Sequence, residues 1–326
     1  MISSSAPAGN PALTIGYSPC PNDTFIFYAL THGLIELPEM ELAAPLLEDV
    51  ETLNIWALEH RLDVTKLSFH ALGHVLDEYC VLSAGSALGR GCGPLLVARG
   101  PLEICGSKPL RVAIPGRLTT AALLLRLYLS SCSQAMDGQV SQAPGMVQER
   151  PQAMDGQVSQ AAGRPEVIEM RFDTIMEAIR QGEVDAGVII HESRFTYEQL
   201  GLVCLQDLGQ WWEKSTGHPI PLGCIAARRS LGRERIAAID QAIRASVDWA
   251  FANPDACLPY IRQHAQELDS QVVFDHIGLY VNDFSRDLGP EGTAAITAFL
   301  ERGRVAGILP FVSQGLRCEE ESPPGI

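Results

Sequence analysis

Short apolar runs alternate with helical patterns along the chain up to about residue 228. The apolar runs are rich in Val, Ile and Leu and are bounded by Gly, Pro, Asn or Asp, which is typical of strands, and the segments between them have helical spacing. This alternation predicts an α/β fold of βαβ units around a mostly parallel sheet. The predicted strands are Leu13–Gly16, Glu41–Leu47, Val64–Leu67, Leu95–Arg99, Arg111–Ile114, Val167–Met170, Ala186–Ile190 and Gly223–Ala227, and the predicted helices include Phe25–Leu30, Val50–Glu59, Thr120–Leu129 and Thr174–Gln181.

The pattern changes after residue 228. From Arg233 to the end the spacing is almost entirely helical, and Ile236, Ile239, Ile243 and Val247 recur every three or four positions. That recurrence predicts one buried face on a long helix.

Two segments have the composition of chain crossings between lobes. Gly89–Pro94 and Gly217–Gly223 each place Gly and Pro directly before an apolar strand, where a chain changes direction or hinges. We therefore predict a two-lobed protein with two chain crossovers and a ligand cleft between the lobes. Lobe I would comprise residues 1–108 and 220–326, with its C-terminal part helical, and lobe II residues 109–219.

One segment is duplicated. QAMDGQVSQA occurs at 134–143 and again, unchanged, at 152–161. Two copies are too few for a repeat architecture, and the sequence is polar, aperiodic and interrupted by Gly and Pro. It predicts a disordered insertion at about 132–165, between a helix and the next strand, without a catalytic role.

Composition narrows the classes of partner. The 326 residues exceed one core of ordinary size, so two domains are expected. The net charge of −15 argues against nucleic acid or an anionic membrane as a partner, so an anionic ligand would need local donors.

The sequence has no apolar run near the roughly 18 residues of a membrane span. The N-terminal residues MISSSAPAGNP lack a basic, apolar export signal, so we expect a cytoplasmic protein. A homodimer is left open.

The nine cysteines form neither a disulfide framework nor a zinc motif, because their number is odd and no CxxC pair occurs. His70 and His74 are spaced i, i+4 but lack a third ligand, so no metal site is predicted. The glycines at 89, 91 and 93 precede a strand rather than follow one, which is the wrong context for dinucleotide binding.

Two early strands end in residues that could bind an anion, since ligands collect at the carboxyl ends of parallel strands. After the first strand, two prolines stiffen Ser18–Thr24, in which Asn22, Asp23 or Thr24 could cap a helix beginning at Phe25. Asp23 is therefore either a helix cap or part of a site. After the third strand, Lys66 and Ser68 could bind a carboxylate, or Lys66 could be an ordinary surface lysine.

Two later strands end in a similar way. Pro115–Ala121 combines a Gly turn with Thr119 and Thr120 at a helix start, which suits either an anion or ordinary capping. The apolar strand Val188–Ile190 ends at His191. A lone histidine is more often structural, but this position makes His191 a candidate general base, since an imidazole can accept a proton near neutral pH.

These segments also carry a family resemblance. In chain order they are SPCPNDTFIFYALTHG, LEDVETLN, TKLS, ALGRGCGPLLVARG, PGRLTTA, HESRFTY and PIPLG. Together they resemble the 1,4-dihydroxy-6-naphthoate synthases of the futalosine route to menaquinone, from about Leu13 to Arg304. The chain departs from the family in the insertion, in a longer N-terminus and at Leu118, where a polar residue is expected in some relatives.

The resemblance implies a type II periplasmic-binding-protein fold. It implies a lyase that converts cyclic dehypoxanthine futalosine to 1,4-dihydroxy-6-naphthoate and a sugar-derived three-carbon fragment, with no metal or organic cofactor. It also implies roles for individual residues: His191 matches the proton acceptor, Lys66, Leu67 and Ser68 match one substrate-binding segment, Thr119, Thr120 and Ala121 match another, and Asp23 lines the same cleft.

Two other functions stay open. Chorismate dehydratase of the same pathway shares the fold, but the complete SPCPNDTF and HESRFTY segments favour the synthase. A solute-binding protein of a transporter would release its ligand unchanged. The missing export signal and the strand-end histidine favour an enzyme.

Overall fold

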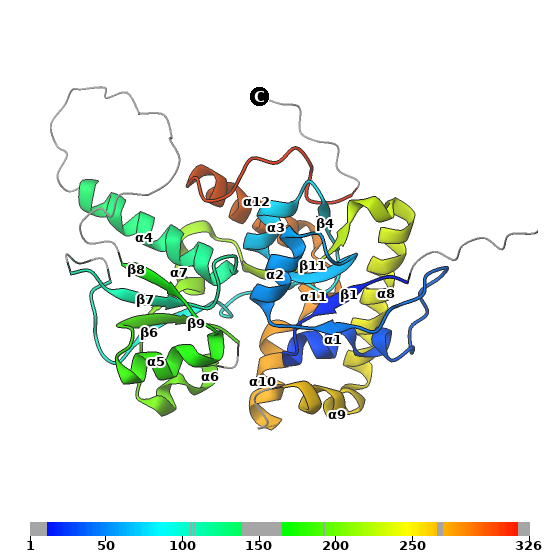
Figure 1. Ribbon diagram of the computed structural model, residues 1–326, viewed down its shortest axis with the longest axis horizontal. Coiled ribbons are helices and arrows are strands. Elements are labelled where there is room, and N and C mark those ends of the chain that lie inside the picture. The colour runs from blue at the N-terminus through cyan, green and yellow to red at the C-terminus, as the bar shows by residue number, and fades with distance from the viewer. Residues whose placement is uncertain are drawn as a thin grey trace, which may run out of the picture. The chain divides into compact units, whose positions relative to one another are not determined.

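The computed structural model describes residues 12–104, 106, 108–138, 165–191, 193–265 and 270–318 (Figure 1). Its strands are β1 Ile15–Tyr17, β2 Leu46–Leu47, β3 Val64–Ser68, β4 Tyr79–Val81, β5 Ala87–Gly89, β6 Leu95–Ala98, β7 Arg111–Ile114, β8 Glu166–Glu169, β9 Ala186–Ile189, β10 Val203–Asp207 and β11 Ile220–Arg228. Its α-helices are α1 Pro21–Thr31, α2 Val50–Leu58, α3 Phe69–Val75, α4 Thr120–Gly138, α5 Ile175–Gln181, α6 Ser193–Thr196, α7 Leu208–Thr216, α8 Arg233–Ala252, α9 Pro254–His264, α10 Ser270–Tyr280, α11 Asp283–Arg286 and α12 Gly289–Val305. Short 3₁₀ helices cover Phe172–Thr174, Tyr197–Leu200 and Arg229–Leu231.

The chain divides into two compact units. Unit 1 contains the residues up to Gly93, Leu118–Thr120 and the residues from Trp212 onward, and unit 2 contains Pro94–Arg117 and Ala121–Trp211. The boundaries thus lie earlier than the expected positions near 108 and 220. The reason at the first boundary is β6, which hydrogen-bonds to β9 and β10 and so belongs to the second sheet.

Unit 1 is built on a sheet of order β2-β1-β3-β11-β4, with β5 also paired to β11. The strands β2, β1 and β3 are parallel, and Ile15 lies opposite Val64. The long strand β11 runs antiparallel to β3, β4 and β5. The parallel register places the carboxyl ends of β1 and β3 at the same edge of this sheet.

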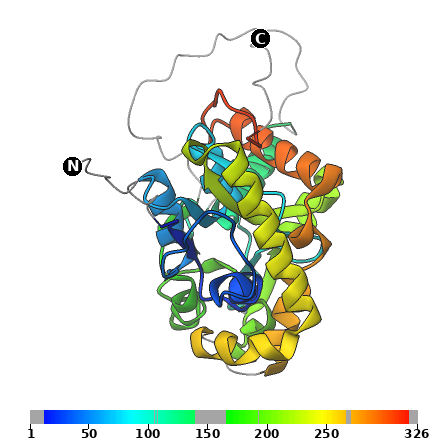
Figure 2. The ribbon, with the colours of Figure 1, turned by 90° about the vertical axis from the view of Figure 1, so that its right-hand side faces the viewer.

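Helices of the C-terminal third cover the core of unit 1. Figure 2 shows α8 (yellow) beside α1 (blue), and the two helices are in contact. The predicted stripe on α8 is confirmed, because Ile236, Ile239, Ile243 and Val247 are all buried. They pack in one apolar cluster with β1 and α1, so the helix that carries Asp23 is held against the rest of the unit.

Unit 2 has a second sheet of order β10-β6-β9-β7-β8. Here β7 is parallel to β8 and β9, whereas β6 is antiparallel to β9 and β10. Its core joins β6, β7 and β9 to α5 through Val97, Ala113, Ile179 and Ile189. All four residues of β9 are buried, so the chain reaches His191 from a fixed strand.

The expectation of a mostly parallel sheet is wrong: each sheet combines parallel and antiparallel pairs. Each of the eight predicted strands has a counterpart. Seven of them differ from the observed strands by at most three residues at an end, but the predicted strand Glu41–Leu47 is observed only as the two residues of β2. Three strands were not predicted. Two of them, β4 and β5, are three residues long and too short to show a period. The third, β10, has mixed polarity.

The duplicated segment begins in a helix, since α4 continues to Gly138 rather than ending at Leu129. The insertion expected to start near 132 therefore starts later. The rest of the predicted insertion, including the second QAMDGQVSQA copy, lies outside the described residues. In the part of the chain that is described, no helix is long and apolar enough to cross a membrane.

Candidate functional site

Asp23 lies in the first turn of α1 and turns back toward the end of β1. The helix begins at Pro21 with Cys20 in the N-cap position, so Asn22, Asp23 and Thr24 are not caps, and the predicted start at Phe25 is four residues late. Proline suits this first position because the first helical N–H needs no partner within the helix. Asp23 Oδ2 instead accepts hydrogen bonds from the backbone N–H (3.2 Å) and the hydroxyl (2.7 Å) of Ser18.

Lys66 forms a buried ion pair with Asp23. Its Nζ lies 2.8 Å from Asp23 Oδ1, and the two side chains are 5% and 2% exposed. Lys66 also donates to the Gly85 carbonyl at 3.1 Å, and the Asn22 amide donates to Asp23 Oδ1 at 2.9 Å. The interpretation of Lys66 as an ordinary surface lysine is therefore wrong. We call Ser18, Asn22, Asp23 and Lys66 the Asp23 network.

The pairing changes the chemistry expected of Lys66. Its charge is already compensated by Asp23, so it is not a free cation for a ligand carboxylate. Two of the three ammonium hydrogens are directed at Asp23 and Gly85. The third has no partner among the described residues and remains able to donate.

Two buried polar atoms near this network have no hydrogen-bond partner in the described part of the chain. They are the amide oxygen Oδ1 of Asn22 and the hydroxyl of Ser86, the residue that follows Gly85. Asn22 is 7% exposed and Ser86 is fully buried. Buried polar atoms are almost always hydrogen-bonded, so each exception calls for an explanation.

The other residues of the β3 segment are held from α2. Ser68 sits in the N-cap position of α3 but makes no side-chain cap bond. Instead, Asn54 accepts from its backbone N–H at 2.9 Å and donates to its hydroxyl at 3.2 Å. Leu67 is fully buried in the strand, so its side chain belongs to the core.

The turn before α4 holds a carboxylate of the protein itself. Glu51, at the start of α2, accepts from the Leu118 backbone N–H at 3.0 Å and from the Asn54 amide at 3.1 Å. The Leu118 N–H, in the turn where we expected a ligand anion, thus binds Glu51. Leu118 contributes its backbone N–H to this contact, and a polar residue at the same position would contribute the same group.

The two threonines at this turn are also engaged. The Thr120 hydroxyl donates to the Leu222 carbonyl at 2.6 Å, and the Thr119 carbonyl accepts from His70 Nδ1 at 3.1 Å. The Thr120 hydroxyl hydrogen is therefore directed at the protein rather than at a ligand. Ala121 is buried in the first turn of α4 and, by its contacts, is counted in unit 2.

His191 belongs to unit 2 and follows β9 after one residue. Its φ is +56°, in the left-handed region that few residues other than glycine occupy, although Asn, Asp and His are enriched among them. Its ring is half-buried and meets Phe172 edge to face, with 5.0 Å between ring centroids. Such a backbone outlier persists only where the surroundings impose it, and outliers cluster at functional sites.

The structure thus brings Asp23 and Lys66 together and adds Ser18 and Asn22. The sequence suggests Asn22 only as one of three possible helix caps, and it does not mark Glu51 or Asn54 as site residues. Those two are spaced i, i+3 in the correctly predicted helix α2, so the signal for a shared polar face was present. The Gly85 carbonyl carried no signal, because any residue could supply it.

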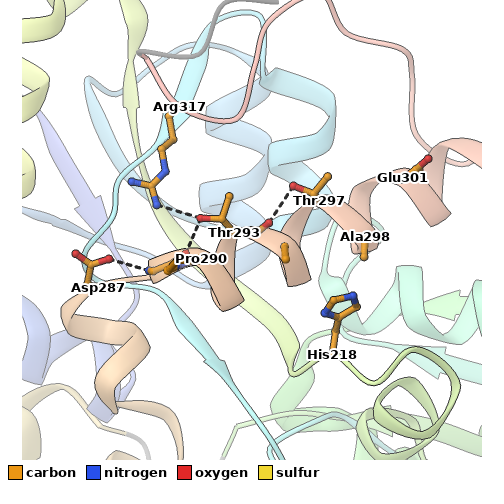
Figure 3. A pocket seen from close by; sticks show the side chains of 10 residues that line it. His218, Asp287, Pro290, Thr293, Thr297, Ala298, Glu301 and Arg317 are labelled. Atoms are coloured by element: carbon orange, nitrogen blue, oxygen red, sulfur yellow. Dashed lines mark hydrogen bonds between the residues drawn. The ribbon is translucent and has the colours of Figure 1, made fainter. Parts of the chain in front are cut away.

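Unit 1 also has an open surface hollow of about 840 Å³ (Figure 3). Arg317 and Thr293 point toward each other on one side of it, joined by a 3.2 Å hydrogen bond. The residues that line it are His218, Asp287, Gly289, Pro290, Thr293, Ala294, Thr297, Ala298, Glu301 and Arg317. It contains none of the predicted site residues. Among the described residues, no three His, Cys, Asp or Glu side chains are placed to hold a metal ion.

Comparison with known proteins relates this arrangement to a family. A family model described as menaquinone biosynthesis matches residues 13–159 and 157–305. The chain belongs to this menaquinone-biosynthesis family. The matched residues include every predicted site residue.

Two members of the family are similar over most of their length. A 1,4-dihydroxy-6-naphthoate synthase of Thermus thermophilus is 50% identical over 297 residues, covering 91% of this chain and 96% of the relative. The Streptomyces coelicolor protein of the same name is 43% identical over 303 residues, covering 91% and 95%. The resemblance found in the sequence is confirmed.

Solved structures confirm the fold. A protein from Archaeoglobus fulgidus superposes with a TM-score of 0.77 at 33% identity, covering 91% of this chain and 98% of its own. A Candida albicans protein described as having the generic periplasmic-binding-protein fold reaches a TM-score of 0.60 at 12% identity, covering 93% and 92%. The chain is a mixed α/β protein with a periplasmic-binding-protein-like fold. The expected ligand cleft stays a prediction.

Proposed function

We propose that this protein is a carbon–carbon lyase that converts cyclic dehypoxanthine futalosine to 1,4-dihydroxy-6-naphthoate and releases a sugar-derived three-carbon fragment. The observation that carries the proposal is the 50% identity, over 91% of the chain, to a relative named for that product. The buried Asp23 network adds a preorganised polar cluster of the kind that orients a substrate.

The binding roles follow the family resemblance, adjusted for the contacts described above. Lys66 contributes its remaining N–H rather than an uncompensated charge. Ser68 is positioned by Asn54. Thr119, Thr120 and Ala121 contribute through the backbone of the α4 start, because the Thr120 hydroxyl is directed at Leu222.

His191 is the proposed general base. An imidazole positioned by its backbone can remove a proton from a substrate hydroxyl. The oxygen then forms a carbonyl on the three-carbon fragment as the carbon–carbon bond breaks, the electron pair of that bond stays on the naphthoate part, and the protonated imidazole returns its proton there. The left-handed backbone of His191 sets the direction in which the side chain leaves the chain, and the imidazole packs edge to face with Phe172. The proposed steps require acid–base groups only, so the proposal includes no metal or organic cofactor.

The test is to incubate the purified protein separately with cyclic dehypoxanthine futalosine and with chorismate, and to follow both reactions by mass spectrometry. We expect 1,4-dihydroxy-6-naphthoate from the first and unchanged chorismate from the second. Dehydration of chorismate would identify the alternative enzyme of the pathway. Binding of either compound without any product would identify a solute-binding protein.

A further inference from the structure

The Asp23 network ends in an acceptor whose direction is fixed. The Asn22 amide donates from Nδ2 to Asp23 Oδ1 at 2.9 Å. The opposite rotamer would put the amide oxygen against a carboxylate oxygen, two acceptors facing each other, so Oδ1 must point away from Asp23. It is buried there and has no partner among the described residues.

Most donors of the Asp23 network are already committed to acceptors of the protein. The Ser18 hydroxyl and backbone N–H go to Asp23 Oδ2. Lys66 directs two hydrogens to Asp23 and Gly85 and keeps one N–H. Lys66 and Asn22 both bond to Asp23 Oδ1, so a ligand group that reaches this network would meet the Asn22 acceptor and the remaining Lys66 donor.

That pairing discriminates between the two polar ends of the proposed substrate. A carboxylate carries no hydrogen at neutral pH, so it cannot satisfy Asn22 Oδ1 and would be repelled by Asp23. A hydroxyl can donate to Asn22 and accept from Lys66. The neutralised ion pair leaves no net positive charge to favour an anion.

We infer that the Asp23 network recognises a hydroxyl of the sugar-derived part of the substrate, with Asn22 Oδ1 accepting from that hydroxyl and Lys66 donating to it or to the adjacent oxygen. Asn22 is then a specificity-determining residue. The aromatic carboxylate binds elsewhere. This assignment rests on the proposed function and adds the orientation of the substrate.

The test combines a protein variant with substrate analogues. Steady-state kinetics compare wild type and Asn22→Leu on cyclic dehypoxanthine futalosine and on analogues that each lack one hydroxyl of the sugar-derived part. The KM of Asn22→Leu should rise roughly tenfold, the effect of one buried hydrogen bond. For wild type, the KM of one deoxy analogue should exceed that of the intact substrate by about the same factor. For Asn22→Leu, the KM of that analogue should be little higher than that of the intact substrate, because both changes remove the same contact.

Ser18→Ala is the matched control, since it removes another hydrogen bond to Asp23 without touching the Asn22 oxygen. It should not abolish discrimination against the deoxy analogue. If removing each hydroxyl raises KM as much for Asn22→Leu as for wild type, Asn22 acts only on Asp23 and the inference is wrong. The inference is also wrong if Ser18→Ala abolishes the discrimination as completely as Asn22→Leu does. Failure of wild type to convert the intact substrate would instead reject the proposed function. Circular dichroism confirms that each variant is folded.

Discussion

Lys66 in β3 and His191 just after β9 are held in different ways. At β3, in unit 1, Lys66 is fixed by an ion pair, and donors surround both oxygens of Asp23. At β9, in unit 2, His191 is fixed by a left-handed backbone and an aromatic ring. The first arrangement is stiff and electrically neutral, which suits recognition. The second leaves an imidazole on a constrained backbone, which suits proton transfer. Substitutions should therefore have different effects in the two regions.

The largest effect is expected at His191. Replacing it with Asn removes the titratable nitrogen and keeps a residue that tolerates positive φ. Turnover should fall by about 10²–10⁴-fold, the usual contribution of a positioned base, while the melting temperature stays close to wild type. His60→Asn is the matched control, because His60 has a φ of +54° and is exposed. Equal turnover in both variants would reject His191 as the base.

A large stability effect is expected at Lys66. Lys66→Met leaves the Asp23 carboxylate buried without its counter-charge, which should lower the free energy of unfolding by about 3–5 kcal/mol. The double variant Asp23→Asn/Lys66→Met removes both charges and should recover part of that loss. Urea unfolding followed by circular dichroism measures both. A Lys66→Met protein as stable as wild type would show that the pair is not the structural unit we describe.

A smaller effect is expected at Thr120. Thr120→Val removes the hydroxyl that donates to the Leu222 carbonyl, which should cost about 1–2 kcal/mol of unfolding free energy. The KM should change by less than about threefold, because the hydroxyl is not directed at the ligand. Thr120→Ser keeps the hydroxyl and should behave like wild type. A tenfold rise in KM with unchanged stability would show instead that the Thr120 hydroxyl binds the substrate.

The smallest effect is expected at Asp77, an exposed carboxylate that contrasts with the buried Asp23. Hydrogen bonds from the side chain and backbone of Ser313, with another from Gln314, lower the pKa of Asp77, while partial desolvation opposes them. A lowered folded-state pKa gives stability that is present above the unfolded value, about 3.9, and lost as the pH falls through the folded value. Asp77→Asn should lower the melting temperature at pH 7 by about 1 °C or less. The difference from wild type should shrink below pH 4 in calorimetry, and a constant difference across pH would contradict the assignment.

The sequence predicts residues better than it predicts their partners. The α8 stripe and all the described strands except β4, β5 and β10 follow from local apolar periods, and the sequence predicts them. The antiparallel pairing of β11 with β3, and of β6 with β9, depends on contacts between distant segments, which no local period contains. Likewise, the sequence predicts both Asp23 and Lys66 as site residues, but their ion pair depends on the register of β1 against β3. The contact between Glu51 and Leu118 is a third case. The partner of Glu51 is a backbone N–H, which a residue of any type except proline could supply.

Our central proposal assigns substrate recognition to Asn22 and the proton transfer to His191. Calorimetric binding of cyclic dehypoxanthine futalosine to His191→Asn, compared with Asn22→Leu, tests it most directly. We predict that His191→Asn binds within about threefold of the wild-type affinity and forms almost no product. Asn22→Leu should bind about tenfold more weakly and still turn over at saturation. If His191→Asn loses binding in proportion to turnover, or if Asn22→Leu binds as tightly as wild type, the division of roles is wrong.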